Sequence, residues 1–139
     1  MKITRFAALG LAASLASAPL RTEARLRVGL DVGGTKIAAI LLDEDAKILA
    51  RVSRSTRHGA AGLLQSVVSA IDELLESANA SASQLKSIGV GIPGLVDPKA
   101  GIVQHAVNLG LEEDSLNLRA ALHERFPAAR ISKIGRAHV

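Results

Sequence analysis

The glycine pair Gly33-Gly34 separates two strand-like stretches, and no other feature limits the fold as strongly. Before the pair, residues 26–32 alternate between apolar and other residues, which is the period of a strand with one buried face. After the pair, residues 37–42 form a continuous apolar run, typical of a strand buried on both faces. Residues 43–46 have turn composition and lead into a third strand at residues 48–53. The sequence therefore predicts a three-strand meander with a tight turn at the glycine pair.

A helix and a glycine-rich strand follow this meander. Apolar residues recur at helical spacing from Leu63 to Ala78, and Asn79 is suited to end the helix. In residues 88–92 the apolar side chains alternate with glycine, so one face of this strand is nearly bare backbone. We expect another group to approach the strand closely on that face.

The last part of the chain predicts a turn, a strand and a second helix. Residues 97–101 have turn composition, and residues 102–107 form a fifth strand. Asn117 can cap a helix whose apolar stripe ends at Phe126. The expected order is βββαββα, an α/β arrangement with no second-domain boundary within residues 26–131.

The turn motif Asp31-Val32-Gly33-Gly34-Thr35-Lys36 has the composition of a phosphate-binding loop. It lies between two strands, unlike a Walker loop, whose glycines and lysine open a helix. Two glycines allow backbone N–H groups to form an anion-binding concavity, to which Thr35 adds a hydroxyl and Lys36 a charge. Asp31, at the strand end, can hold a hydrated Mg²⁺ that accompanies nucleotide phosphates. The alternative interpretation is a plain hairpin turn, which also favours two glycines.

Composition excludes several classes of function. The 139 residues fit one domain or part of one, and the absence of cysteine removes disulfides, thiol redox chemistry and Cys-based metal sites. The net charge of +4 is modest, and Phe6 and Phe126 are the only aromatic residues, so there is no stacking platform for single-stranded nucleic acid. His58, His105 and His123 are scattered without paired spacing, which favours surface or packing roles over metal binding.

The two ends differ from the central residues 26–132. Residues 1–25 combine basic residues, an apolar run and the small residues 16–18, which is the outline of a secretory signal. The alternative is an extension that results from a start codon assigned too far upstream. The apolar run is too short to span a bilayer. Residues 133–139 continue no periodic pattern and resemble a translated sequencing adapter, so we expect a non-native tail there.

A second element strengthens the interpretation of the turn motif. The segment Ile88-Gly89-Val90-Gly91-Ile92-Pro93-Gly94-Leu95-Val96-Asp97 is followed by Gly101-Ile102-Val103 and by Asn108-Leu109-Gly110. In the order and spacing of these elements, residues 27–130 resemble the ROK family of bacterial sugar kinases and repressors. The resemblance implies a truncated N-terminal lobe of the actin-like ATPase fold, which is ribonuclease H-like and binds ATP and sugar in a cleft between two lobes.

The resemblance also implies roles for individual residues. The first phosphate loop for ATP would comprise Asp31, Gly33, Gly34, Thr35 and Lys36, with Mg²⁺ held at Asp31. Gly94 and Leu95 would lie along the sugar, and Asn108 near the sugar hydroxyls. The alternatives are structural, because Gly94 can serve as a turn residue after Pro93 and Asn108 can cap a loop.

Other parts of the family's site do not occur in this sequence. The family's Glu-Asn-Asp-Ala-Asn segment supplies the aspartate that deprotonates the sugar hydroxyl, and the chain contains no such segment. The His/Cys zinc site, the second phosphate loop and the adenosine pocket are also missing. Asp97 is not expected to act as the base, because the neighbouring Pro98 favours a turn. The sequence therefore predicts no catalytic residue within this chain.

Three functional hypotheses follow. In the first, the intact protein phosphorylates a hexose such as glucose with MgATP in the cytoplasm, which favours a start codon assigned wrongly, too far upstream, over export. In the second, it is a sugar-responsive repressor, which would need a helix-turn-helix domain ahead of the first strand. In the third, the chain as written is inactive because it lacks the base. The expected partner is a hexose, without nucleic acid or membrane, and a homodimer is the candidate assembly.

Overall fold

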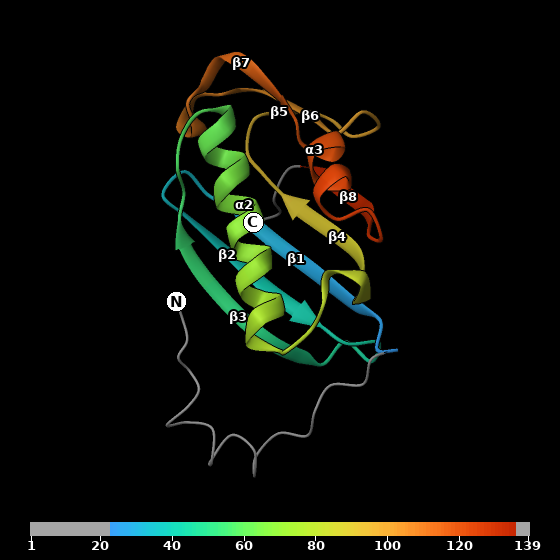
Figure 1. The fold of residues 1–139 in the computed structure, drawn as a ribbon. Coiled ribbons are helices and arrows are strands. Elements are labelled where there is room, and N and C mark those ends of the chain that lie inside the picture. Colours follow the sequence, from blue (N-terminus) through green and yellow to red (C-terminus); the bar gives the residue numbers. More distant parts are fainter. Residues whose placement is uncertain (1–22, 136–139) are drawn as a thin grey trace.

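A five-stranded sheet forms the centre of the molecule (Figure 1). The computed structural model describes residues 23–135, except for the side chains of Leu95, His105, Glu113 and Lys133. The strands lie in the order β3-β2-β1-β4-β8; the first three are antiparallel, and β4 and β8 run parallel to β1. Their bounds are β1 (Leu26–Val32), β2 (Lys36–Leu42), β3 (Ile48–Ser55), β4 (Leu85–Gly91) and β8 (Arg130–Gly135).

The predicted meander is confirmed, with one difference in burial. On β2, Ile37, Ala39 and Leu41 are buried, whereas the residues between them are exposed or half-buried. The prediction that this strand is buried on both faces is therefore wrong for the described residues. The other face of β2 is not buried because, within residues 23–135, helix α2 (Ala60–Ser77) covers only one face of the sheet (Figure 1).

The covering helix is α2 (Ala60–Ser77), which packs on β2 and β3. Most of its apolar stripe is buried against the sheet, with Leu64 and Val68 partly buried at its margin, because residues three and four apart share a helix face. The predicted stop is confirmed, since Asn79 follows the helix with φ 54°. Asparagine tolerates this left-handed conformation, which ends many helices.

A smaller antiparallel sheet lies beyond the ends of β1 and β4 (Figure 1). It has the order β5-β6-β7, and its strands are β5 (Leu95–Asp97), β6 (Ile102–Ala106) and β7 (Leu111–Asn117). The predicted turn before β6 is confirmed, because Asp97 Oδ1 accepts from the amides of Lys99 and Ala100 at 3.0 and 3.1 Å. Short 3-10 turns η1 (Ala82–Gln84) and η2 (Val107–Leu109) precede β4 and β7.

Helix α3 (Leu118–Arg125) begins where the sequence predicted it. The Asn117 side chain accepts a hydrogen bond from the Ala120 amide at 3.0 Å, which satisfies one of the unpaired donors of the first turn. Arg125 joins the end of α3 to α2 through an ion pair with Asp72 at 2.9 Å.

The Asn117 cap is expected to contribute to the stability of the fold. Replacing Asn117 with alanine is expected to lower the free energy of unfolding by about 1 kcal/mol, because the Ala120 amide loses its acceptor. Urea denaturation followed by circular dichroism measures this change. Asn117→Asp, which keeps a capping oxygen, should remain within about 0.5 kcal/mol of the unchanged chain. Equal loss in both variants would mean that the side-chain oxygen does not cap α3.

The expected order βββαββα misses three strands. β7 is a mostly polar sequence that gives no strand pattern, and β5 is only three residues long. β8 continues through Gly135, across the boundary predicted after Ser132, and Ile134 is buried. That residues 133–139 are non-native stays a prediction. The signal-like run and the last four residues lie outside the described residues. In the described part of the chain, no helix has both the length and the apolar content to cross a membrane.

Candidate functional site

The turn between β1 and β2 leaves two backbone amides unused. The Gly33 amide donates to the Lys36 carbonyl at 2.9 Å, which closes a tight turn. The amides of Gly34 and Thr35 have no hydrogen-bond partner among residues 23–135. Adjacent unpaired N–H groups in a turn form a concavity that attracts anions. The turn thus has the donors that a phosphate group needs.

The charged and hydroxyl side chains of this loop are also unengaged. Asp31, Thr35 and Lys36 are exposed, and none of their side chains bonds to another described residue. By contrast, Arg54 pairs with Glu73 at 2.7 Å. Free charged groups of both signs in one loop are suited to a ligand that carries both phosphate and a metal ion.

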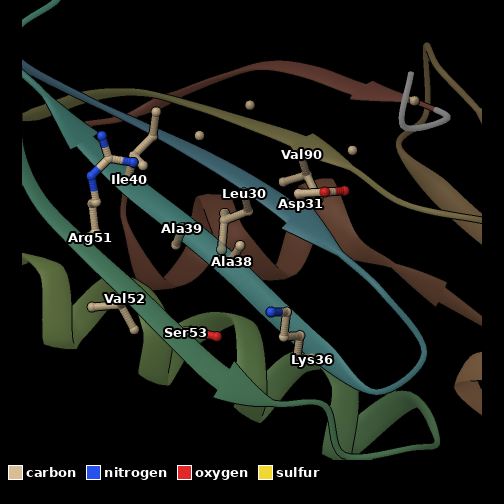
Figure 2. Close-up of a pocket in the computed structure, with 14 residues that line it drawn as sticks. Leu30, Asp31, Lys36, Ala38, Ala39, Ile40, Arg51, Val52, Ser53 and Val90 are labelled. Atoms are coloured by element: carbon tan, nitrogen blue, oxygen red, sulfur yellow. The ribbon is translucent and has the colours of Figure 1, made fainter. Parts of the chain in front are cut away.

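Asp31 lies in a row of small residues on the uncovered face of the sheet. Its neighbours across the strands are Ala38 on β2 and Gly91 on β4, and the next residues in the row are Ser53 and Gly135. Figure 2 shows Asp31 on β1 with Lys36 and Ala38 on the adjacent strand. A groove of about 750 Å³ lies over this face and includes Gly29, Gly89 and Gly91 in its lining. The predicted bare face of β4 is therefore confirmed, and it leaves open space beside the carboxylate.

Asn108 lies next to the turn between β1 and β2. A Cβ atom on Gly34 would lie 3.1 Å from both the Cβ and the carbonyl oxygen of Asn108, a contact closer than side chains normally make. These residues are far apart in the sequence and come from the β1–β2 turn and from η2. The predicted phosphate and sugar residues Gly34 and Asn108 are thus neighbours.

Gly94 and Leu95 are placed differently. Gly94 follows β4 with φ 106°, and a Cβ atom there would lie 2.8 Å from the Ala106 Cβ, so glycine is required by packing against β6. Leu95 begins β5 and pairs with Gln104 of β6. The structural interpretation of Gly94 thus has direct support, and contact of either residue with a sugar stays a prediction.

The segment that connects β3 to α2 contacts both the loop and η2, and sequence reasoning missed it. The Thr56 amide donates to the Thr35 carbonyl at 2.9 Å, and its Oγ1 donates to the Gly33 carbonyl at 2.8 Å. His58 Nε2 lies 2.7 Å from the Gly34 carbonyl oxygen. The Gly59 amide donates to the Leu109 carbonyl at 2.8 Å. No local pattern could reveal these bonds, since each joins residues from separate elements.

A metal ion at this site would have one protein carboxylate. Among residues 23–135, no cluster of three or more His, Cys, Asp or Glu side chains is arranged to hold a metal. Magnesium suits such a site, because it keeps several waters and is commonly held by one or two carboxylates together with substrate phosphates. Asp31, with small residues around it, fits that requirement.

Comparison with known proteins identifies related chains. A glucokinase from Halalkalibacterium halodurans is 30% identical over 105 residues, which are 74% of this chain and 32% of the relative. The structure of a ROK family glucokinase from Streptomyces griseus, in complex with glucose and AMPPNP, is 28% identical with a TM-score of 0.62, covering 76% of this chain and 32% of that one. This chain therefore spans about a third of the length of these relatives.

A ROK family transcriptional regulator, a homologue of the Escherichia coli MLC protein, shares the fold with a TM-score of 0.63 at 16% identity, over 80% of this chain and 27% of the regulator. The expected fold class, the N-terminal lobe of an actin-like ATPase, is confirmed by these likenesses. The model of the ROK family matches residues 27–130, the same segment on which the sequence motifs lie. This chain belongs to the ROK family.

Proposed function

We propose that residues 26–132 form the N-terminal lobe of an ATP-dependent hexose kinase. The observation that carries this proposal is the pair of amides at Gly34 and Thr35, beside the carboxylate of Asp31 and the ammonium of Lys36, none of which has a partner within the described residues. Kinases gain most of their rate from positioning and charge stabilisation, so unpaired donors next to a metal-binding carboxylate are the parts such an enzyme needs.

The nucleotide is proposed to bind with its phosphates at the β1–β2 turn. The two amides would donate to phosphate oxygens, Lys36 would add positive charge, and Asp31 would hold Mg²⁺ through water. MgATP, when bound, supplies the phosphoryl group for transfer. The similarity to a glucokinase structure in complex with AMPPNP supports ATP as the nucleotide.

The sugar is proposed to lie near Asn108. Its amide carries both donors and an acceptor, the groups that recognise hydroxyls, and η2 places it against the phosphate loop. Glucose is the first candidate because the relatives with 28–30% identity are named glucokinases. An ATP-dependent reaction favours the cytoplasm for the intact protein.

The repressor hypothesis is ranked second. The fold is shared with a transcriptional regulator, so fold alone does not distinguish the two functions. The free phosphate-loop donors favour the kinase, because a sugar-responsive repressor does not require nucleotide phosphates at this turn. We also propose that the 139-residue chain binds the nucleotide but does not phosphorylate a hexose, because it contains no Glu-Asn-Asp-Ala-Asn segment to supply the base.

The test is nucleotide binding by the 139-residue chain. In two-dimensional NMR spectra, addition of ADP with Mg²⁺ is expected to shift the amide resonances of Gly34 and Thr35 more than those of α2, because only the loop amides gain a partner. Adenosine, which has no phosphate, serves as the control and should leave the loop unchanged. Unchanged loop amides at millimolar MgADP would refute the proposal. With glucose and MgATP, the same sample is expected to release no ADP.

A further inference from the structure

The unpaired amides of Gly34 and Thr35 share peptide groups with two carbonyls that side chains of the β3–α2 connection contact. The carbonyl of Gly33 belongs to the same peptide group as the amide of Gly34, and it accepts from Thr56 Oγ1 at 2.8 Å. The carbonyl of Gly34 belongs to the same peptide group as the amide of Thr35, and it lies 2.7 Å from His58 Nε2. Because a carbonyl oxygen only accepts, His58 must carry its proton on Nε2 in this contact.

Peptide geometry links each of these carbonyls to its amide. A trans peptide group is planar, and its C=O and N–H point in opposite directions. A side chain that fixes the direction of the carbonyl therefore fixes the direction of the amide as well. Glycine makes such support necessary, because it does not by itself prefer one backbone conformation.

We propose that Thr56 and His58 are positioning residues, which aim the Gly34 and Thr35 amides at the nucleotide phosphates. This inference rests on the proposed function, and it adds a role for the β3–α2 connection. Each bonds to a backbone carbonyl of the loop and would act on the nucleotide through that carbonyl. Preorganised donors bind an anion more tightly, because no conformational freedom is lost when the anion arrives.

The same connection also fixes where η2 lies. The Gly59 amide, next to His58, donates to the Leu109 carbonyl at 2.8 Å, and Leu109 follows Asn108. A Cβ on Gly110 would lie 2.8 Å from the Gly59 nitrogen, so η2 and the connection are in direct contact. Residues 56–59 thus hold the predicted phosphate and sugar segments in one arrangement.

The test compares His58→Ala with His58→Gln. Glutamine offers an N–H donor at a similar reach, whereas alanine offers none. His58→Ala is expected to weaken MgADP binding about two- to tenfold, the range for one lost hydrogen bond, while His58→Gln stays within about twofold. The 13C shift of the Gly34 carbonyl, measured without nucleotide, should change in the alanine variant and be restored by glutamine. His58 is exposed and lies just before α2, so resonances in the second half of α2 should remain unchanged.

Several outcomes decide the proposal. An alanine variant with wild-type MgADP affinity and an unchanged Gly34 carbonyl would overturn it, as would equal loss in the glutamine variant. If the alanine variant unfolds, two other comparisons replace it. His58→Asn keeps an amide on a side chain one carbon shorter than glutamine. Thr56→Val removes the hydroxyl that donates to the Gly33 carbonyl, whereas Thr56→Ser keeps it. If the unchanged chain does not bind MgADP at all, the proposed function fails, and the carbonyl shift alone then decides whether His58 orients the loop.

Discussion

Replacing Asp31 with asparagine is expected to weaken MgADP binding by about 100-fold, the upper range for loss of one interaction with a charged group. Asparagine has the same shape but does not carry the negative charge that attracts hydrated Mg²⁺. ADP without magnesium should bind the variant as well as it binds the unchanged chain, or slightly better, since a carboxylate repels phosphates. Calorimetric titrations with Mg²⁺ and with EDTA measure the two effects separately.

The fold should tolerate this change, because the Asp31 side chain is exposed and bonds to no other described residue. The free energy of unfolding is therefore expected to stay within about 0.5 kcal/mol. Asp45→Asn in the β2–β3 turn, which removes the same charge elsewhere, is the matched control and should leave MgADP binding unchanged. An equal loss of ADP affinity with and without magnesium would show that Asp31 does not act through a metal ion.

Local sequence patterns predicted the elements whose burial repeats regularly. β1 and α2 have one buried face each, so their apolar residues recur with periods of two and 3.6. β7 could not be found this way, because it is a mostly polar strand. Its partner is β6, and only the fold supplies that pairing.

In the candidate site, too, local sequence predicted some residues, whereas others are brought together only by the fold. The loop of residues 31–36 was predicted, because two glycines, a hydroxyl and two charges are adjacent in the sequence. The resemblance implied a place for Asn108 near the sugar hydroxyls, but its position beside Gly34 was not predicted, since these residues meet through tertiary packing. His58 was predicted to be a surface or packing residue. Its bond to the Gly34 carbonyl spans 24 residues and depends on the register of β2 and β3.

The second large effect is on stability, at the end of α3. Phe126 is fully buried and is the only aromatic residue in the described part of the chain. Replacing it with alanine is expected to lower the free energy of unfolding by about 3–5 kcal/mol, because the lost ring leaves a cavity as well as lost burial. Domains of this size have about 5–15 kcal/mol in total, so the variant should be close to unfolding. Urea denaturation measures the change.

Two further variants separate packing from charge. The guanidinium of Arg125 lies 4.8 Å from the centre of the Phe126 ring and pairs with Asp72, but both charged side chains are nearly half exposed. Arg125→Ala should therefore cost no more than about 1 kcal/mol. Phe126→Leu keeps most of the apolar volume and should cost less than Phe126→Ala. If Arg125→Ala proved as damaging as Phe126→Ala, the surface contact rather than the buried ring would hold α3 in place.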